Sequence, residues 1–518
     1  MLPRVRAACA AVGPLMRIPP TAAPRPISFP PPATVVPGSG ELCEFDARQL
    51  IDAYGAGRVN PCTVIDALLA RVTDIDGGVG AMWAMDEVGA RRAAMESTHR
   101  WQSGTARPLD GVPIVVKDLL DTAGLATTGG SGWLTDRVPT ENAAVVAAVH
   151  RAGAIVIGKT ATFELGCGDE STPFGTVRNP WNRAHTTGGS SAGSAAALAM
   201  RFAPLAIGTD TGGSIRIPSS YCGVTGLKPT LGRLSTVGLL GLAPSLDAPG
   251  PMARSAADVS LLFAAMTAAE SSHAQPVGVE PYDSYLHGVR IGLPTGWLMA
   301  VLTEEVAEAF ELAVDCLARL GATIVPVELT VAQHGAPLSW LITMYEAAEL
   351  YADVSRDLLT PAFRGRLEVG DRIAASDYRA AMEARQRLTW RVVSAFDGLD
   401  ALVVPGSVST APRFDDLYGD VAGVAATWPD VHARTMALWN VTGFPSVNVP
   451  IGHGAGRLPI GMQIVARHGA DETCLALAVA YQTATDHHLR SPDCIHRLVE
   501  GGEVNGEKLF GEEEGRTR

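Results

Sequence analysis

The chain has 518 residues, of which 47% are hydrophobic and 18% are charged. This composition is too apolar and too weakly charged for a disordered chain or a coiled coil. Acidic residues outnumber basic ones by 54 to 41, and the net charge of −13 repels phosphate backbones and anionic membrane surfaces. We therefore expect a globular protein that has no nucleic acid as a main partner.

The two ends of the chain differ from its body. Residues 1–40 are rich in proline and are predicted to be a disordered extension rather than a secretory signal. Residues 500–518 are acidic and lack an apolar period, so we predict a disordered tail. No window reaches the roughly 18 consecutive apolar residues that cross a bilayer, and no membrane span is expected.

The eight cysteines are widely spaced and include no C-x-x-C pair. This spacing fits neither a disulfide framework nor a thiolate zinc site. It favours a reducing compartment, and we predict a cytoplasmic protein that needs no metal and no cofactor.

Helix patterns and strand patterns alternate along the body. Residues 141–150 place Val145, Val146 and Val149 on one helical face, Gly153 is positioned to end the helix, and 154–157 read as a buried strand. The same step recurs where Thr303 is predicted to cap a helix that ends at Gly321, before a second buried strand at 322–325.

Three further apolar runs, at 401–404, 447–449 and 460–465, are predicted strands. Helices that alternate with buried strands indicate an α/β sandwich around a largely parallel or mixed sheet.

Two glycine-serine clusters, at 187–194 and 208–216, stand out between the predicted elements. Paired glycines allow successive N–H groups to turn into one concavity that binds an anion or an oxyanion. Acyl transfer needs a hydroxyl nucleophile beside such donors, and Gly212, Gly213 and Ser214 supply both parts in sequence. Ser214 is therefore the candidate nucleophile.

A serine nucleophile needs a base, and Lys117 ends the apolar run 112–116. Burial disfavours an ammonium and lowers its pKa, which can leave an amine that accepts a proton near neutral pH. Lys159 and Lys228 also lie in the body, and for each of the three lysines taken alone a structural cation at the end of a strand or in a loop is the favoured interpretation.

These motifs resemble the amidase signature family of serine hydrolases. The resemblance is carried by the segments 111–118, 188–194 and 208–216, the last of which continues through 222–230. Weaker similarity extends over residues 46–488, which implies a single large domain. The family's fold, an α/β/α sandwich around a large mixed β-sheet, is the expected fold class. Two residues depart from the family's pattern: Thr187 stands where proline is common and Ala192 where glycine is common.

The resemblance implies a Ser-Ser-Lys triad in which Ser214 attacks, Ser190 relays the proton and neutral Lys117 is the final base. Ser190 would follow a cis peptide bond from Gly189. The family's oxyanion hole maps to the N–H groups of Thr211, Gly212, Gly213 and Ser214. Supporting roles fall to Ser191, Asp210 and Arg216, with a surface ion pair as the alternative for the last two.

Three alternatives remain open. Ser191 lies at the centre of a G-x-S-x-G pattern and could be the nucleophile of an α/β-hydrolase-type esterase, although residues 179–185 read as a turn instead of the required strand. The glycine-rich loops could cradle phosphate, but they lack the order of known nucleotide motifs. The chain could also be the amidase-like subunit of a glutamine-dependent tRNA amidotransferase.

The favoured partner is a small-molecule amide, hydrolysed to an acid and ammonia or an amine. The physiological amide and the oligomeric state stay open, with a homodimer as one option. Four aromatic side chains are conceivable walls of the pocket, and core positions are the alternative for each: Trp133, Trp181, Trp340 and Tyr345.

Overall fold

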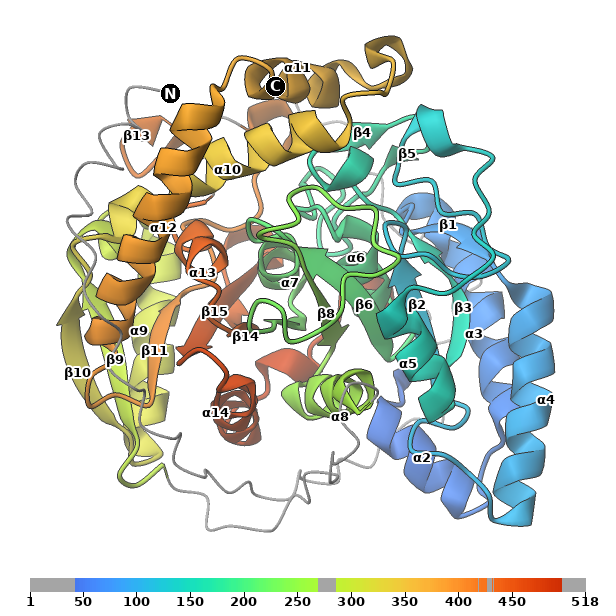
Figure 1. Ribbon diagram of the computed structural model, residues 1–518. Coiled ribbons are helices and arrows are strands. Elements are labelled where there is room, and N and C mark those ends of the chain that lie inside the picture. The colour runs from blue at the N-terminus through green and yellow to red at the C-terminus, as the bar shows by residue number, and fades with distance from the viewer. Residues whose placement is uncertain (1–41, 269–285, 418, 426–430, 432, 496–518) are drawn as a thin grey trace, which may run out of the picture.

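The computed structural model describes residues 42–268, 286–417, 419–425, 431 and 433–495. Helices and strands alternate along most of this part of the chain (Figure 1). The α-helices are α2 (Ala47–Gly55), α3 (Pro61–Ile75), α4 (Glu87–Ser103), α5 (Ala144–Ala152), α6 (Ala192–Ala199), α7 (Arg216–Cys222), α8 (Ala256–Thr267), α9 (Glu304–Arg319), α10 (Gly335–Leu350), α11 (Pro361–Gly370), α12 (Ala375–Ala395), α13 (Ala437–Val441) and α14 (Asp471–Thr483).

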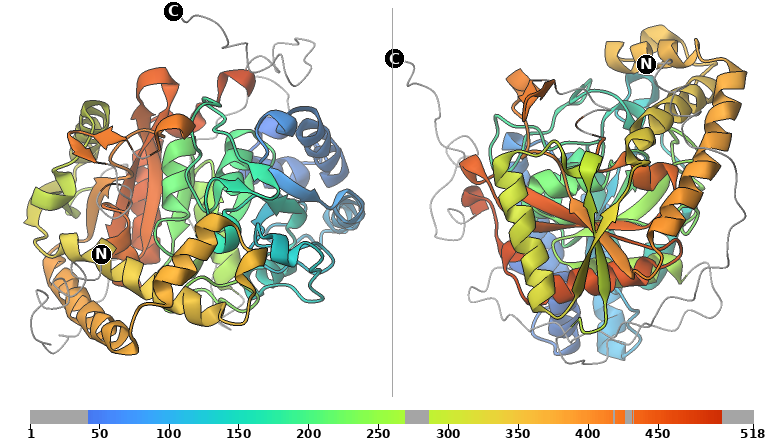
Figure 2. Two further views of the ribbon diagram at one scale, coloured as in Figure 1. Left: turned by 90° about the horizontal axis from the view of Figure 1, so that it is seen from above. Right: turned by 90° about the vertical axis from the view of Figure 1, so that its left-hand side faces the viewer.

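Eleven strands within the described residues form one sheet. Their order across the sheet is β1 (Met82–Met85), β3 (Ile155–Thr160), β2 (Pro113–Lys117), β6 (Leu205–Asp210), β8 (Ala248–Ala253), β7 (Thr225–Lys228), β14 (Ser446–His453), β15 (Pro459–Ala466), β11 (Ala401–Pro405), β9 (Arg290–Thr295) and β10 (Thr323–Glu328). The right-hand view of Figure 2 shows these strands fanning about the viewing axis, which is the usual sheet twist. Two small hairpins pair β4 (Ser171–Thr172) with β5 (Gly175–Thr176) and β12 (Asp420–Val421) with β13 (Val424–Ala425).

The sheet is mixed. Strand β2 runs parallel to β3 and β6, and β9 runs parallel to β10 and β11. The remaining neighbours are antiparallel, so the largely parallel alternative is wrong for this chain. The mixed sheet expected from the family resemblance is confirmed.

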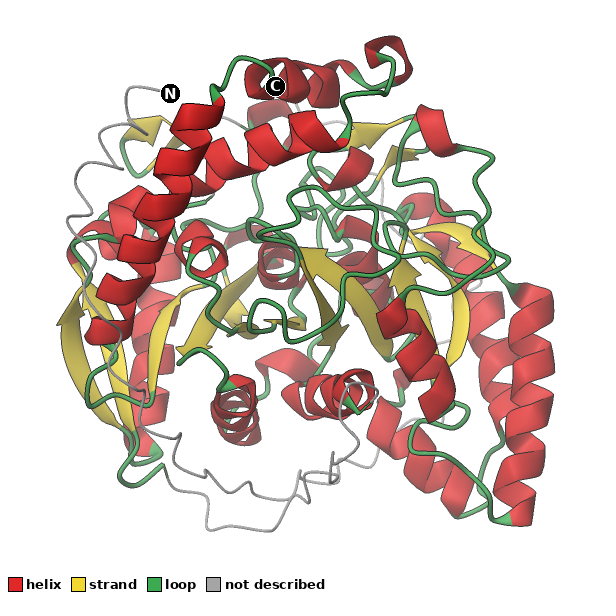
Figure 3. Cartoon of the chain, viewed as in Figure 1, coloured by secondary structure: helices red, strands yellow, loops and turns green. Residues whose placement is uncertain are grey.

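Helices cover both faces of the sheet (Figure 3). On one face, α5, α8, α9 and α14 contribute to a single large cluster of buried apolar side chains. On the other face, α3, α4 and α6 cover one half of the sheet, and α10, α12 and α13 cover the other half. Two helical layers that each bury one face of a sheet make the α/β/α sandwich that was predicted.

Strand β2 shows how the layers fix the position of Lys117. Ile114 and Val116 join the cluster on one face, whereas Val115 joins the cluster on the other. This alternation is the two-residue period of a strand that is buried on both sides. Because β2 and β6 are parallel, their last residues, Lys117 and Asp210, lie at the same edge of the sheet, where ligands commonly bind in α/β folds.

Most predicted elements occur close to their expected positions. The helix predicted at 141–150 is α5, which ends at Gly153 with a φ of 103°. The helix that follows Thr303 is α9. The strands predicted at 401–404, 447–449 and 460–465 lie within β11, β14 and β15.

Two local predictions hold in position but are wrong in one detail each, the burial of a strand and a capping hydrogen bond. The strand predicted at 322–325 is β10, which is an edge strand with exposed or half-buried residues, because it has a neighbour on only one side. Thr303 occupies the N-cap position of α9, but its hydroxyl makes no capping hydrogen bond and is buried without a partner in the part of the chain that the structure describes.

The predicted Pro-rich extension at 1–40 and the predicted tail at 500–518 lie outside the described residues. Among the described helices, none has the length and the apolar character needed to cross a bilayer. The described cysteines are all free thiols.

Candidate active site

Lys117 ends β2 and points its amine at three hydroxyl groups. Its Nζ atom lies 2.8 Å from Ser190 Oγ, 2.8 Å from Thr209 Oγ1 and 3.0 Å from Ser191 Oγ, with the Thr209 carbonyl oxygen at 3.4 Å. The lysine side chain is fully buried. The side chain is therefore not a solvent-facing cation at the end of a strand, and it meets the first glycine-serine cluster directly.

Burial lowers the pKa of Lys117 to about 7. The low-dielectric surroundings disfavour the ammonium more than the nearby carboxylates of Asp210 and Asp247 favour it. A substantial fraction of the amine is therefore neutral near pH 7, so that its lone pair can accept a proton.

Ser190 and Ser191 lie immediately before α6, and the peptide bond between Gly189 and Ser190 is cis, as the resemblance implies. Ser191 is fully buried, donates its hydroxyl proton to the Thr209 carbonyl (3.1 Å), and its backbone N–H donates to the Ser214 carbonyl (3.0 Å). Ser191 thus links the two glycine-serine clusters. It is absent from the pocket lining, where a nucleophile would have to be exposed.

The loop that carries Ser214 is folded around the carboxylate of Asp210, the last residue of β6. Asp210 accepts hydrogen bonds from the backbone N–H of Gly213 (2.8 Å) and of Ile215 (3.1 Å). Gly213 has a φ of +121°, a region that L side chains rarely adopt, so glycine suits this turn. Because the Gly213 N–H is already donated to Asp210, the geometry does not support its predicted place in an oxyanion hole.

Asp210 and Arg216 form an ion pair that is completely buried. Arg216 Nε lies 2.9 Å from Asp210 Oδ2, and both side chains have zero exposure. The surface ion pair considered from the sequence is therefore wrong. The Arg216 guanidinium also donates to Asn440 Oδ1 (2.6 Å) and Gln463 Oε1 (2.8 Å), while Asn440 Nδ2 donates to Asp210 Oδ1 (2.7 Å). Burial alone would raise the pKa of Asp210, but the guanidinium holds it well below its usual range.

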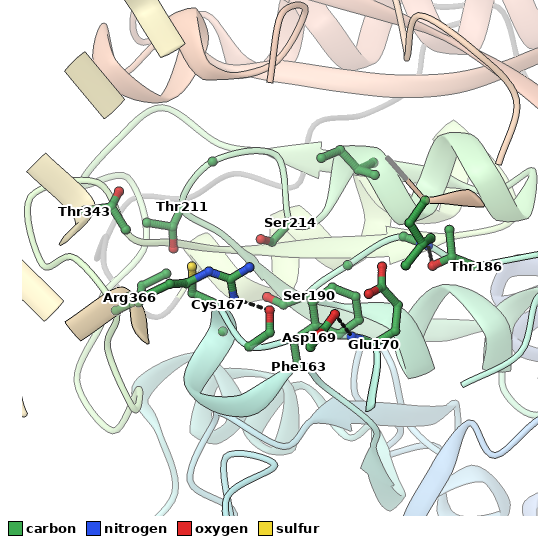
Figure 4. A pocket seen from close by; sticks show the side chains of 18 of the residues that line it. Phe163, Cys167, Asp169, Glu170, Thr186, Ser190, Thr211, Ser214, Thr343 and Arg366 are labelled. Atoms are coloured by element: carbon green, nitrogen blue, oxygen red, sulfur yellow. Dashed lines mark hydrogen bonds between the residues drawn. The ribbon is translucent and has the colours of Figure 1, made fainter. Parts of the chain in front are cut away.

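A cavity opens beside Ser190 and Ser214, and Figure 4 shows both side chains pointing into it. Thr211 and Gly212 line it next to Ser214. The apolar part of the wall consists of Phe163, Ile217, Tyr221, Leu242, Trp340 and Met344. Charged side chains line another part of the wall: Asp169, Glu170 and Arg366.

Two of the charged side chains in the wall, Arg366 and Asp169, form hydrogen bonds with nearby backbone groups. Arg366 donates to the Gly168 carbonyl, and the backbone N–H of Glu170 donates to Asp169 Oδ1 (3.0 Å), as the dashed lines in Figure 4 show. Burial, followed by the neighbouring Asp169, raises the pKa of Glu170 to about 8. Within the described residues, no three His, Cys, Asp or Glu side chains come together as a metal site.

Several other candidates from the sequence lie elsewhere. Lys159 Nζ contacts Asp118 Oδ1 (3.4 Å) and donates to the Leu120 carbonyl (2.7 Å), and Lys228 donates to the Pro229 carbonyl (2.7 Å), so both amines are buried and hydrogen-bonded outside the pocket. Of the four aromatic candidates, only Trp340 lines the pocket. Trp133 packs on Tyr351, Trp181 donates to the Cys222 carbonyl, and Tyr345 stacks on Tyr378.

The sequence indicates no role for Thr209, Asn440 or Gln463. Thr209 lies inside the motif at 208–216, where its position next to Asp210 was the available signal. Asn440 and Gln463 come from α13 and β15, more than 220 residues beyond Arg216, and nothing in the spacing of the sequence predicts their contacts.

Comparison with known proteins identifies the family of this chain. A family model described as Amidase matches residues 63–475. The chain belongs to the amidase signature family. This amidase is 34% identical over 487 residues to a glutamyl-tRNA(Gln) amidotransferase subunit from Roseiflexus sp. (strain RS-1), a match that covers 88% of this chain and 98% of the relative.

Solved structures of amidases share the fold. A crystal structure of an amidase superposes with a TM-score of 0.78 at 29% identity, covering 85% of this amidase and 99% of the other chain. The native peptide amidase from Stenotrophomonas maltophilia gives a TM-score of 0.73 at 28% identity, and the match covers 87% of this amidase and 98% of the other chain. The chain is thus an enzyme of the class that acts on amide C–N bonds.

Proposed function

We propose that this enzyme hydrolyses a carboxylic acid amide through an acyl-enzyme on Ser214, with Ser190 as proton relay and Lys117 as base. The observation that carries the proposal is the 2.8 Å contact between the buried Lys117 amine and Ser190 Oγ, next to a pocket that both Ser190 and Ser214 line. A serine without a base is a weak nucleophile, and this contact supplies the base.

The surroundings of Lys117 Nζ suit a neutral amine, which has two N–H groups and one lone pair. Ser191 gives its own proton to the Thr209 carbonyl, so its oxygen can accept one N–H of the lysine. Thr209 Oγ1 can accept the other at 2.8 Å. The lone pair is then directed at Ser190, whose hydroxyl donates to it.

In the first half of the reaction, Ser214 Oγ attacks the amide carbon. Its proton passes to Ser190 as the proton of Ser190 passes to Lys117, which becomes an ammonium. In the collapse of the tetrahedral intermediate, Ser190 gives a proton to the leaving nitrogen and regains one from Lys117. The C–N bond breaks and ammonia or an amine departs. Water then attacks the ester by the same relay, and the acid is released.

The carbonyl oxygen becomes negative in the tetrahedral intermediate and needs preorganised donors. In this proposal the backbone N–H groups of Thr211, Gly212 and Ser214 provide them, since Thr211, Gly212 and Ser214 line the pocket at the nucleophile. Gly213 acts by shaping the turn through its hydrogen bond to Asp210.

The test is ammonia release from a panel of aliphatic, aryl and amino acid primary amides. We expect the wild type to hydrolyse at least one of them, and Lys117→Ala and Lys117→Met to lose about 10³-fold or more in kcat, as serine hydrolases do when a triad member is removed. Ser194→Ala is a matched control, because Ser194 is a buried serine whose hydroxyl contacts Thr160 (2.7 Å) outside the pocket. Full activity of both Lys117 variants would refute the proposed base.

A second candidate function is that of an amidotransferase component, because the relatives described above include a glutamyl-tRNA(Gln) amidotransferase subunit that matches over 98% of its length. This function predicts glutaminase activity and a stable protein partner. Affinity purification from the source cells, followed by glutaminase assays with and without any captured protein, distinguishes the two functions. Glutamine hydrolysis that appears only in the complex would favour the amidotransferase, whereas hydrolysis of other amides by the isolated chain favours the free amidase.

A further inference from the structure

Asp247 is a buried carboxylate that contacts the nucleophile loop from outside the triad. Its Oδ1 atom accepts a hydrogen bond from Thr211 Oγ1 at 2.5 Å. Its Oδ2 atom accepts from the backbone N–H groups of Leu242 (2.9 Å) and Ala243 (3.1 Å). The side chain therefore joins two loops that both contribute to the pocket, since Thr211 and Leu242 line it.

The sheet explains why these loops meet. Strands β6 and β8 are antiparallel, and Asp210 at the end of β6 pairs with Ala248 at the start of β8. Thr211 and Asp247 are the next residues beyond this pair, so they leave the sheet side by side. Both side chains are buried, which fixes the hydroxyl and the carboxylate in contact.

The loop that carries Leu242 and Asp247 is also hydrogen-bonded to the end of helix α10. Asp247 N–H donates to the Ala243 carbonyl (2.9 Å), which closes the turn 243–247. Tyr351, at the C-terminal end of α10, donates its hydroxyl proton to the Gly241 carbonyl (2.5 Å). Helix α10 carries Trp340 and Met344 of the pocket wall. A continuous set of hydrogen bonds thus runs from α10 through the 241–243 loop to Thr211.

We infer that Asp247 is a positioning residue for amide hydrolysis: it holds the Thr211 segment so that the backbone N–H groups at 211 and 212 face the carbonyl oxygen of the reacting amide. This inference rests on the proposed function. Figure 4 shows Thr211 on the same part of the pocket wall as Ser214, so a shift of Thr211 would move these donors relative to the nucleophile.

A carboxylate suits this role because it accepts from one hydroxyl and two N–H groups at once. An asparagine in its place could keep the two N–H bonds through its carbonyl oxygen and donate its NH₂ to Thr211 Oγ1, which has a free lone pair once its own proton turns away. An alanine would leave all three donors without this acceptor. Asp247→Asn is therefore the conservative variant and Asp247→Ala the disruptive one.

The experiment measures kcat and KM for a primary amide that the wild type hydrolyses, together with the rate at which a fluorophosphonate probe labels Ser214. In labelling, the Ser214 Oγ–P bond forms, fluoride leaves, and the serine proton passes to Lys117 through Ser190. The variants are Asp247→Ala, Asp247→Asn, Thr211→Val and the double variant Thr211→Val/Asp247→Ala. Thr211→Val removes the hydroxyl but keeps the backbone N–H.

We expect Asp247→Ala and Thr211→Val each to lower kcat and the labelling rate about 10- to 100-fold with little change in KM, because a misplacement near 1 Å can cost about 100-fold. Asp247→Asn should recover most of the loss. The double variant should be no slower than the slower single variant, because both changes break one contact.

The inference is overturned if folded Asp247→Ala or Asp247→Asn changes KM alone, or if the two single effects multiply in the double variant. It is also overturned if Thr211→Val retains wild-type kcat, a result that does not depend on whether Asp247→Ala folds. A wild type that neither releases ammonia nor reacts with the probe would contradict the proposed function itself, which separates the two failures.

Discussion

The amine nitrogen of Lys117 lies 2.8 Å from the hydroxyl oxygen of Ser190, although 73 residues separate them in the chain. The contact joins the carboxyl end of β2 to the start of α6, which packs against β2. Both side chains are buried, and Ser190 also lines the pocket, so the contact connects the buried amine to the cavity. If Lys117 is the base proposed above, this contact determines how activity depends on pH, on each serine and on the neighbouring hydroxyl of Thr209.

The rate of acylation should rise with pH through about 7. Burial lowers the pKa of Lys117 to about 7, and below this value the ammonium has no lone pair with which to accept the proton of Ser190. We expect kcat/KM, measured from pH 5 to 9, to rise in a single step with its midpoint near pH 7. Circular dichroism at each pH is the control for folding. A value of kcat/KM that still rises steeply at pH 9, as expected for a base with the ordinary lysine pKa of about 10.4, would contradict a buried neutral base.

The three serines should differ in covalent labelling. Ser214→Ala should abolish labelling by a fluorophosphonate probe, since it removes the attacking oxygen. Ser190→Ala should slow labelling about 10²- to 10⁴-fold, which is the usual contribution of a proton-transfer group. Ser191→Ala should still be labelled on Ser214, more slowly than the wild type, because Lys117 loses one acceptor. Intact mass spectrometry gives the extent of labelling, and loss of labelling in Ser191→Ala alone would identify Ser191 as the nucleophile.

Thr209→Val should lower the maximal rate about 10-fold and shift the acidic limb of the pH profile to lower pH. The hydroxyl of Thr209 accepts from Lys117 Nζ at 2.8 Å, and an acceptor stabilises the ammonium, so its removal lowers the lysine pKa further. Thr209→Ser keeps the hydroxyl and should return the limb towards pH 7. Identical pH profiles for the valine variant and the wild type would show that this hydroxyl does not contact the base in solution.

Asp210→Ala should reduce the free energy of unfolding by about 3–5 kcal/mol, because it leaves the Arg216 guanidinium buried without its counter-ion. Chemical denaturation measures the loss. Asp415→Ala is the matched control, since Asp415 pairs with Arg413 at an exposed position and its removal should change the midpoint little. Equal effects of the two substitutions would contradict the buried pair.

The pH dependence of the Asp210 contribution follows from its lowered pKa. In the unfolded chain an aspartate titrates near 3.9, whereas the folded chain keeps Asp210 ionised below that pH. The stabilisation is therefore present at all pH values above about 4, and it is lost as the pH falls towards the folded-state pKa.

The sequence predicts the layered fold, and it indicates the residues proposed as the triad, because the signals for both are local. Valine faces at 145–149 and the stop at Gly153 predict α5, and the glycine-serine motifs contain Ser190, Ser191 and Ser214 within short segments. The amide partners of Arg216 could not be predicted, because Asn440 and Gln463 reach it only once β15 and α13 pack against the nucleophile loop.

Three other features could not be predicted from the sequence, because each depends on backbone geometry or on the order and pairing of strands. The donation of the Gly213 N–H to Asp210 depends on a turn whose dihedral angles the residue types permit but do not fix. The exposure of β10 depends on strand order, which places it at the edge of the sheet beyond β9. The link from Asp247 to Thr211 depends on the antiparallel pairing of β6 with β8.

All the lysines within the described residues, Lys117, Lys159 and Lys228, are buried, with at most 1% of their surface exposed. Amine-reactive dyes, cross-linkers and immobilisation resins therefore find no lysine target on this part of the folded surface. Conversely, acylation of Lys159 or Lys228, which lie outside the pocket, requires the surrounding sheet to open. Peptide mapping after timed exposure to an N-hydroxysuccinimide ester would thus follow the opening of the sheet at these two positions, without any engineered label.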